Sequence, residues 1–474
     1  MTLAGSTGVG SGRLTDLDAG LGSGRHAIGG PPLLRPALVV VLVATAVYLI
    51  GIWEHAACRV TRVGQHVDQF AQLCYTDIPL LYRGRGLVLG NTPYLDSGNY
   101  PVLEYPVLTG WFLEFERLVT VALGAPSGAA LSEQQQLTAS VTFYDVNTVL
   151  LFVLFLIAVM AQLRTVEGRP GDALLLAASP CVAATALINW DLLPVALTAV
   201  GFACWSRHKP TAAGIFWGLG MAAKLYPVFF LGPLVLLCLR SRRMREFGTM
   251  IAGFAVAWLV VNLPVIVLAP DAWLDFWRFN SDRSGDLGSL WYVLSLAGHE
   301  VPSINVVALL IFAALCVLIA FLCLGAPVRP RFGSVAFLVL AAFLVTNKVY
   351  SPQYVLWLLP LLVLARPRWR EWVIFTGGEL AYWAAIWGHL GGTLSPGNGS
   401  ADRIYWLAVI VRLATESWVA MTVVRDVLRP AHDPLRPPDL DPDAPADPTG
   451  GVLDGAPDAF ARRREDALVT TPAP

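Results

Sequence analysis

The sequence predicts an all-α protein whose helices cross a membrane many times. Of its 474 residues, 55% are hydrophobic and only 14% are charged, and the mean hydropathy is +0.59. Soluble domains carry roughly 25% charged residues, so this composition excludes them. Sixteen Trp and 21 Phe suit a chain with aromatic belts at both membrane interfaces. We therefore predict a polytopic bundle of about 11–13 transmembrane helices.

The N-terminal part contains a polar segment followed by the first span. Residues 1–35 are rich in Gly and Ser and carry three Arg, so we expect a disordered cytoplasmic segment. The apolar run from Pro36 to Trp53 is long enough to cross about 30 Å of hydrocarbon when its ends are counted. Because no lipoprotein cleavage site follows it and further spans do, we interpret it as a retained signal-anchor.

The remaining apolar segments define the transmembrane domain, residues 36–428. They lie near 105–124, 143–163, 171–188, 190–206, 211–223, 225–239, 247–268, 303–325, 333–346, 353–365, 372–390 and 403–424. The segment 105–124 has two interpretations, a full span or a juxtamembrane or re-entrant helix. Glu114, Glu116 and Arg117 favour the second, because charges in the middle of a bilayer are costly.

The positions of Arg and Lys predict the orientation. Connectors near residues 164–169, 207–209, 240–245, 329–331, 366–370 and 425–429 are basic, which places them in the cytoplasm. The alternate connectors, 54–104, 189–191, 224–227, 270–302, 347–353 and 391–402, then lie outside. We expect a multi-pass protein of the plasma (inner) membrane. The Pro- and Asp-rich residues 429–474 are expected to form a disordered cytoplasmic tail.

The cysteines and the net charge limit the chemistry. Only Cys58 and Cys74 share a polar loop, where an oxidising compartment would permit a disulfide; two unrelated thiols remain the alternative. No His or Cys cluster has metal-ligand spacing, and a net charge of -1 gives no reason to expect nucleic acid. No Gly-rich phosphate loop is present, so ATP and NAD chemistry have no support.

Several polar residues of the outer connectors stand in apolar surroundings. Asp77 begins an apolar helix, Asp191 and Lys224 are almost alone among hydrophobic residues, and Lys348 lies between two spans. An ionisable residue in such a place is a functional candidate. A carboxylate can act as general base on an attacking hydroxyl, and cations can neutralise charge on a departing phosphate. The alternatives are a helix N-cap for Asp77 and interfacial snorkelling for the two lysines.

These residues occur in an order that resembles a known family. The order is Asp77 with Tyr82, Gly90 to Tyr94, Tyr105-Pro106 opening a helix, Gly214 to Pro227 with Lys224, and Ser351 to Tyr354. It resembles the GT-C membrane glycosyltransferases over residues 37 to 425. It is most like glycosyltransferase family 87, the actinobacterial polyprenyl-phosphate-mannose-dependent mannosyltransferases. Asn347 to Val349 with Gln353-Tyr354 also resembles the mannosyltransferase of the GPI core.

The resemblance implies a GT-C fold, an inverting reaction and a lipid-phosphate sugar donor. It carries the catalytic Asp to Asp77 and the family's Lys to Lys224. The sequence departs from the family's pattern at two places. There is no paired Asp-x-Asp around Asp77, which leaves the use of a divalent metal open, and Tyr105-Pro106-Val107 stands in place of Tyr-Pro-Pro. Lys348, Arg278 and Arg283 are further candidates to bind the donor phosphate, and the candidates to bind substrate are Tyr82, Glu104, Tyr105, Asp191, Gln353 and Tyr354.

The expected partners are a polyprenyl-phosphate sugar donor, a glycolipid or glycan acceptor, and the lipid bilayer. The expected activity is transfer of mannose or a related sugar on the extracytoplasmic face. Two other classes remain open, a transporter or flippase of polyprenyl-linked lipid and an inactive membrane scaffold. The loop 270–302 combines Trp with Arg and Asp, which suits either closure over an acceptor or an amphipathic interfacial helix.

Overall fold

The protein is an all-α bundle, as the sequence predicts. The computed structural model describes residues 34–96, 100–399 and 401–460, and within these ranges the chain forms helices and no strand. Five helices of the described part are long and apolar enough to cross a membrane. They are α2 (Leu34–His55), which continues to Cys58, α5 (Glu133–Thr165), α11 (Met244–Leu268), α14 (Ile304–Gly325) and α18 (Asp402–Leu428).

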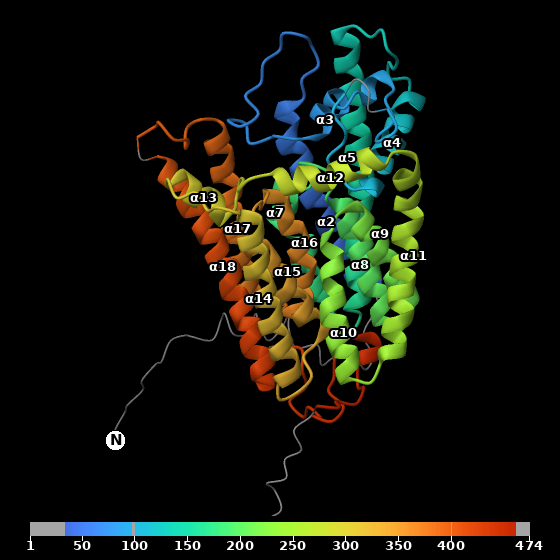
Figure 1. Ribbon diagram of the computed structural model, residues 1–474, viewed down its shortest axis with the longest axis vertical. Helices are drawn as coiled ribbons and strands as arrows, with labels where there is room; N and C mark the ends of the chain where they lie inside the picture. Colours follow the sequence, from blue (N-terminus) through green and yellow to red (C-terminus); the bar gives the residue numbers. More distant parts are fainter. Residues whose placement is uncertain (1–33, 97–99, 400, 461–474) are drawn as a thin grey trace, which may run out of the picture.

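Shorter helices complete the bundle, and the long helices run roughly along its vertical axis (Figure 1). The shorter elements are α3 (Ile78–Gly84), α4 (Val107–Ala122), α6 (Leu174–Ala177), α7 (Pro180–Thr185), α8 (Leu192–Ser206), α9 (Pro210–Ala223), α10 (Leu231–Arg240), α12 (Pro270–Asp282), α13 (Leu290–Leu296), α15 (Phe332–Thr346) and α16 (Val355–Ala365). The remaining helix, α17 (Trp369–Leu390), has 22 residues, as many as α2. Every residue of α16 is buried, so this apolar helix lies inside the bundle.

The two ends of the bundle differ in structure. We call the upper end in Figure 1, which carries residues 56–96 and 100–106 with α3, α12 and α13, the loop end. The opposite end, which carries residues 326–331 and 430–460, is called the tail end. The basic connectors meet at the tail end, where Arg240 and Arg331 both contact residues of the tail. The alternation predicted from Arg and Lys therefore agrees with the arrangement of the helices.

Small residues allow α9 and α11 to pack closely. A Cβ on Gly214 would lie 1.9 Å from the carbonyl oxygen of Met250, and one on Gly218 would lie 2.3 Å from that of Phe254. Close approach at small residues is a common way for transmembrane helices to associate. This contact supports α9, whose C-terminal end carries Lys224.

The segment 105–124 forms α4, which lies with α3 near the loop end (Figure 1). Its charged side chains have partners: Arg117 pairs with Glu114, and buried Glu116 accepts a hydrogen bond of 2.8 Å from Trp190 Nε1. A helix of 16 residues in this position fits the juxtamembrane alternative better than a full span of about 20 residues.

The prediction of a disordered tail is wrong for residues 430–460, which pack against the tail end of the bundle. Asp458 binds Arg240 at 2.6 Å, Asp433 binds Arg331 at 2.7 Å, and Asp447 accepts from the Phe332 amide at 2.9 Å. Because the two arginines are completely buried, they need carboxylate partners, and the tail supplies them. Composition predicted disorder because the tail has few apolar residues. The rest of the predicted tail, 461–474, and residues 1–33 of the predicted N-terminal segment lie outside the described residues.

Candidate active site

Asp77 is positioned at the loop end by the backbone on one side and by a tyrosine on the other. Its amide donates to the carbonyl of Ile188 at 2.8 Å, which ties the loop to the turn before α8. Its Oδ1 accepts a hydrogen bond of 2.6 Å from the Tyr75 hydroxyl. Although Asp77 directly precedes α3, its side chain makes no capping hydrogen bond. The geometry therefore does not support the helix N-cap alternative.

Asp191 and Lys224 form an ion pair close to Asp77. Lys224 Nζ lies 3.0 Å from Asp191 Oδ1, and the Asp191 side chain is only 2% exposed. Lys224 ends α9 and Asp191 precedes α8, so two helix ends bring the pair together. The backbone amide of Asp191 donates to Oδ1 of Asn189 at 3.1 Å, which fixes the turn that carries the carboxylate.

Aromatic rings surround the Lys224 ammonium. Nζ lies 4.9 Å from the ring centre of Tyr105, 5.4 Å from that of Tyr354 and 5.7 Å from that of Trp357. Ring faces at these distances attract a cation. The rings of Tyr354 and Trp357 stack with centres 3.9 Å apart. We call Asp77, Tyr105, Asp191, Lys224 and Tyr354 the loop-end cluster.

The charges around Asp77 change its pKa in opposite directions. Burial raises the pKa of Asp77, whereas the Tyr75 hydrogen bond and the Lys224 ammonium lower it; Glu104 and Asp191 add to the rise. The net direction is upward, so this carboxyl titrates closer to neutral pH than a solvated Asp. A carboxylate with a raised pKa is better matched to accept a proton near neutral pH.

The element that carries Tyr105 is fixed to the lysine-bearing helix. Tyr105 lies just before α4, and in the first turn of α4 the Thr109 hydroxyl donates to the carbonyl of Ala223 at 2.8 Å. Ala223 is the residue before Lys224. On the opposite wall, Gln353 is buried and its Oε1 has no hydrogen-bond partner among the described residues. Gln353 and Tyr354 come from one short 3-10 turn, Pro352–Tyr354.

Other candidates lie outside the loop-end cluster. Tyr82 is buried in the core and stacks on Phe143 with ring centres 4.0 Å apart. The Arg278 side chain is 54% exposed and bonds Asp271 and Asp275 on its own helix, α12. The structure brings neither residue to Asp77.

Three charged candidates lie near the cluster but already have partners. Lys348 Nζ donates to the carbonyl of Arg283 at 2.6 Å, so its side chain is turned toward the loop after α12. The guanidinium of Arg283 pairs with Asp286 at 2.6 Å. Glu104, which raises the pKa of Asp77, pairs with Arg85 at 2.6 Å.

Sequence reasoning missed Tyr75, Asn189 and Trp357 as site residues. Tyr75 stands two residues before Asp77 and Asn189 two residues before Asp191, so proximity along the chain was an available signal. Trp357 belongs to a fully apolar helix. Its role beside Lys224 depends on tertiary packing that no local pattern indicates.

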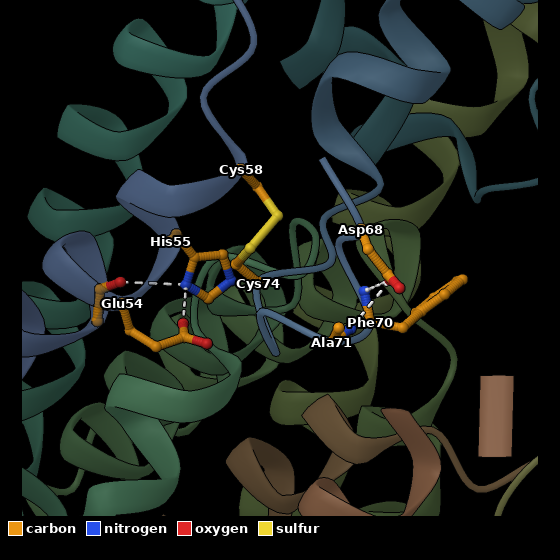
Figure 2. Close-up of a disulfide and its surroundings, with 8 residues drawn as sticks. Glu54, His55, Cys58, Asp68, Phe70, Ala71 and Cys74 are labelled. Carbon is orange, nitrogen blue, oxygen red and sulfur yellow. Dashed lines mark hydrogen bonds and ion pairs between the residues drawn. A yellow bond between two sulfur atoms is a disulfide. The ribbon is translucent and has the colours of Figure 1, made fainter. Parts of the chain in front are cut away.

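Cys58 and Cys74 form a disulfide, so the first of the two sequence alternatives holds (Figure 2). Their Cα atoms are 5.7 Å apart, and the bridge joins the end of α2 to the residue three positions before Asp77. Inside the bridged loop, Asp68 Oδ1 accepts from the amides of Phe70 and Ala71 at 3.0 Å each (Figure 2). The bridge therefore constrains the backbone that leads into Asp77.

The donor set of this site does not match a protein-bound metal centre. The described residues contain no group of three or more His, Cys, Asp or Glu side chains arranged to hold a metal ion. In the loop-end cluster, the carboxylate of Asp191 already has the Lys224 ammonium as its partner.

The fold is that of a polytopic helical bundle, and the loop-end cluster brings charged and aromatic side chains together near one of its ends. The family model described as glycosyltransferase family 87 matches residues 121–347. This match confirms the resemblance found in the sequence and supports a membrane glycosyltransferase. The matched region includes Asp191 and Lys224 and ends before Tyr354, while Asp77 and Tyr105 precede it. No curated protein matches the chain.

Proposed function

We propose that the protein transfers mannose from a polyprenyl-phosphate donor to a cell-envelope glycolipid or glycan, with inversion at the anomeric carbon. The observation that carries this proposal is the loop-end cluster, in which the half-buried carboxylate of Asp77 lies near the Lys224 ammonium. One group can remove a proton and the other can stabilise an anion, and both are close to a membrane surface. A lipid-linked sugar phosphate at that surface requires both functions.

The reaction assigns one step to each residue. Asp77 accepts the proton of the acceptor hydroxyl as general base. The hydroxyl oxygen attacks the anomeric carbon from the face opposite the phosphate, and the bond between that carbon and the phosphate oxygen breaks. The leaving polyprenyl phosphate keeps the electron pair, and Lys224 stabilises its charge. Because Lys224 is paired with Asp191, the phosphate shares the ammonium with this carboxylate.

The aromatic residues of the cluster suit recognition of a sugar. The ring centres of Tyr105 and Tyr354 lie 4.9 and 5.4 Å from Nζ of Lys224. Sites for small molecules are mainly apolar or aromatic walls with a few placed polar groups. Gln353, with an unpaired buried Oε1, and Asn189 supply such groups for the sugar hydroxyls.

Two observations support an extracytoplasmic position of the site. The disulfide between Cys58 and Cys74 is typical of an oxidising compartment, and the basic connectors gather at the other end of the bundle. Single cysteines at Ser289 and Gly391, in a background without the native thiols, should react with an impermeant thiol reagent in intact cells. Cysteines at Arg242 and Arg368 should be protected until the membrane is opened; the reverse pattern contradicts this orientation.

The function is tested with the purified full chain in proteoliposomes. Radiolabelled polyprenyl-phosphate-mannose and an extract of membrane glycolipids are the substrates, and the Asp77→Asn protein is the matched control. We expect label in a glycolipid with the parent protein and a loss of 10²- to 10⁴-fold with the variant. Equal transfer by both proteins would contradict the assignment of Asp77. Transfer from GDP-mannose but not from the lipid donor would contradict the donor class.

A further inference from the structure

A single buried arginine of α18 binds the backbone just before the turn that carries Gln353 and Tyr354. Arg412 is completely buried. Its Nη1 donates to the carbonyl of Tyr350 at 2.6 Å, and its Nη2 donates to the carbonyl of Ser351 at 3.2 Å. Arginine has five donors in a rigid fork, so one guanidinium can hold two successive carbonyls and a carboxylate together.

One carboxylate binds Arg412, and a second binds the tyrosine on which Arg412 packs. Its Nε donates to Glu379 of α17 at 2.9 Å. Glu416, one turn further along α18, accepts a hydrogen bond of 2.8 Å from the Tyr350 hydroxyl. The guanidinium carbon also lies 3.3 Å from the ring centre of Tyr350. The arginine, both glutamates and the tyrosine thus form one buried network that ends on the backbone of residues 350 and 351.

The same segment is held from the other side by the loop between α12 and α13. Tyr350 N donates to the carbonyl of Leu287 at 3.1 Å, and Asp286 N donates to the carbonyl of Lys348 at 2.8 Å. Gly288 has a φ of +78° and packs on the Tyr350 carbonyl, since an added Cβ would lie 2.0 Å from that oxygen. Residues 348–351 are therefore fixed between this loop and Arg412.

We propose that Arg412 is a positioning residue, which holds the segment 346–354 so that Tyr354 stays against the Lys224 ammonium. The reaction assigned to the loop-end cluster is the proposed function on which this inference rests. Arg412 itself does not belong to the cluster. It acts through the two carbonyls that precede Pro352, the first residue of the turn that carries Tyr354.

The test compares two buried arginines that differ in location. Arg412→Lys keeps the charge next to Glu379, but an ammonium cannot reproduce the planar fork that bonds two carbonyls and a carboxylate. Arg366→Lys is the control. Arg366 is equally buried and pairs with Glu371 at 2.9 Å and with Asp426, but these bonds join α16, α17 and α18 at the tail end. Both variants should lose stability, so stability alone does not test the proposal.

Hydrogen–deuterium exchange of the peptide 346–354 and steady-state transfer are measured on both proteins. For Arg412→Lys we expect exchange in this peptide to rise about tenfold or more, and kcat/KM to fall about tenfold, the equivalent of one hydrogen bond to a charged group. For Arg366→Lys both should stay near the parent values. Glu379→Gln keeps an acceptor for Arg412 and should give a smaller change in the same peptide.

The outcomes separate this inference from the proposed function. If exchange in the peptide is the same in Arg412→Lys, Glu379→Gln and the parent, the inference is wrong. It is also wrong if exchange rises while kcat/KM is unchanged, because the segment would then not position the site. If neither the parent nor a variant uses the mannose donor, the proposed function fails, and the exchange comparison with Arg366→Lys still decides whether Arg412 holds the segment.

Discussion

Replacing Asp77 by Asn tests the general base while preserving the local structure. The Asn side-chain oxygen can still accept from the Tyr75 hydroxyl, and the backbone bond from residue 77 to Ile188 is unaffected. We therefore expect a change in the free energy of unfolding of about 1 kcal/mol or less. An amide cannot accept the proton of the acceptor hydroxyl. Transfer should fall by 10²- to 10⁴-fold, which corresponds to about 3–5 kcal/mol in the activation free energy.

The pH dependence gives a second measure of the same group. Because burial raises the pKa of Asp77, the ionised base is lost as the pH falls through a value above that of an ordinary Asp, about 3.9. The Tyr75 hydrogen bond stabilises the carboxylate and so lowers this pKa. Tyr75→Phe removes the bond, raises the pKa further, and should move the acid limb of the rate profile to higher pH.

The assay is initial-rate transfer from a labelled lipid donor in proteoliposomes between about pH 5 and pH 8. Asp68→Asn is the control, since Asp68 lies in the same loop and only accepts from the amides of Phe70 and Ala71. It should retain nearly the parent rate. The reasoning is refuted if Asp77→Asn transfers sugar within about threefold of the parent, or if Tyr75→Phe moves the acid limb to lower pH.

Three further changes have outcomes fixed by buried partners. Lys224→Met should lower the free energy of unfolding by about 3–5 kcal/mol, because Asp191 is left buried without a cation. The double variant with Asp191→Asn should regain much of the melting temperature but not donor binding, and recovered binding would contradict the role of the ammonium. Cys58→Ser should lower the free energy of unfolding by about 3 kcal/mol, as expected for a bridge with a sequence separation of 16 residues, and should lower transfer because the backbone before Asp77 is less constrained. An unchanged melting temperature would show that the bridge does not stabilise the fold. Asp458→Asn should lower the melting temperature without changing KM, since Arg240 loses its charged partner at the tail end; a changed KM would show that the two ends are coupled.

The sequence predicted the helical bundle because hydropathy is a local signal, and five of the described helices are long and apolar enough to cross a membrane. The break at Lys224 was also predicted, because the apolar segments 211–223 and 225–239 match α9 and the 3-10 turn that leads into α10. The predicted segment 171–188 is instead divided into a 3-10 turn, α6 and α7, since short helices are stabilised by the neighbours that bury them. For the segment 105–124, the charges in the sequence indicated a non-spanning helix. The hydrogen bond between Glu116 and Trp190 could not be predicted, because it is a tertiary contact.

For the site, the sequence identified isolated charges better than their partners. Asp77, Asp191 and Lys224 stood out because each interrupts an apolar surrounding, and the structure brings all three together. Arg278 was a candidate as a cation of an outer connector, but it bonds Asp271 and Asp275 on its own helix. The sequence alone does not distinguish a charged residue of a solvated loop from one of a site, because the two differ in burial, which depends on the tertiary structure.

Buried arginines bind carboxylates in two regions of this bundle, and we expect the effect of losing one of them to depend on its location. At the tail end, Arg240 and Arg331 each bind a carboxylate of the tail, and the contacts join the tail to the ends of the helices. Near the loop end, Arg412 binds a carboxylate and also two carbonyls of a segment that reaches the loop-end cluster. Loss of an arginine should cost stability at either end, since a buried carboxylate is left unpaired. Only near the loop end do the released groups include the backbone that holds Tyr354 against Lys224, so only there should the same loss also reduce sugar transfer.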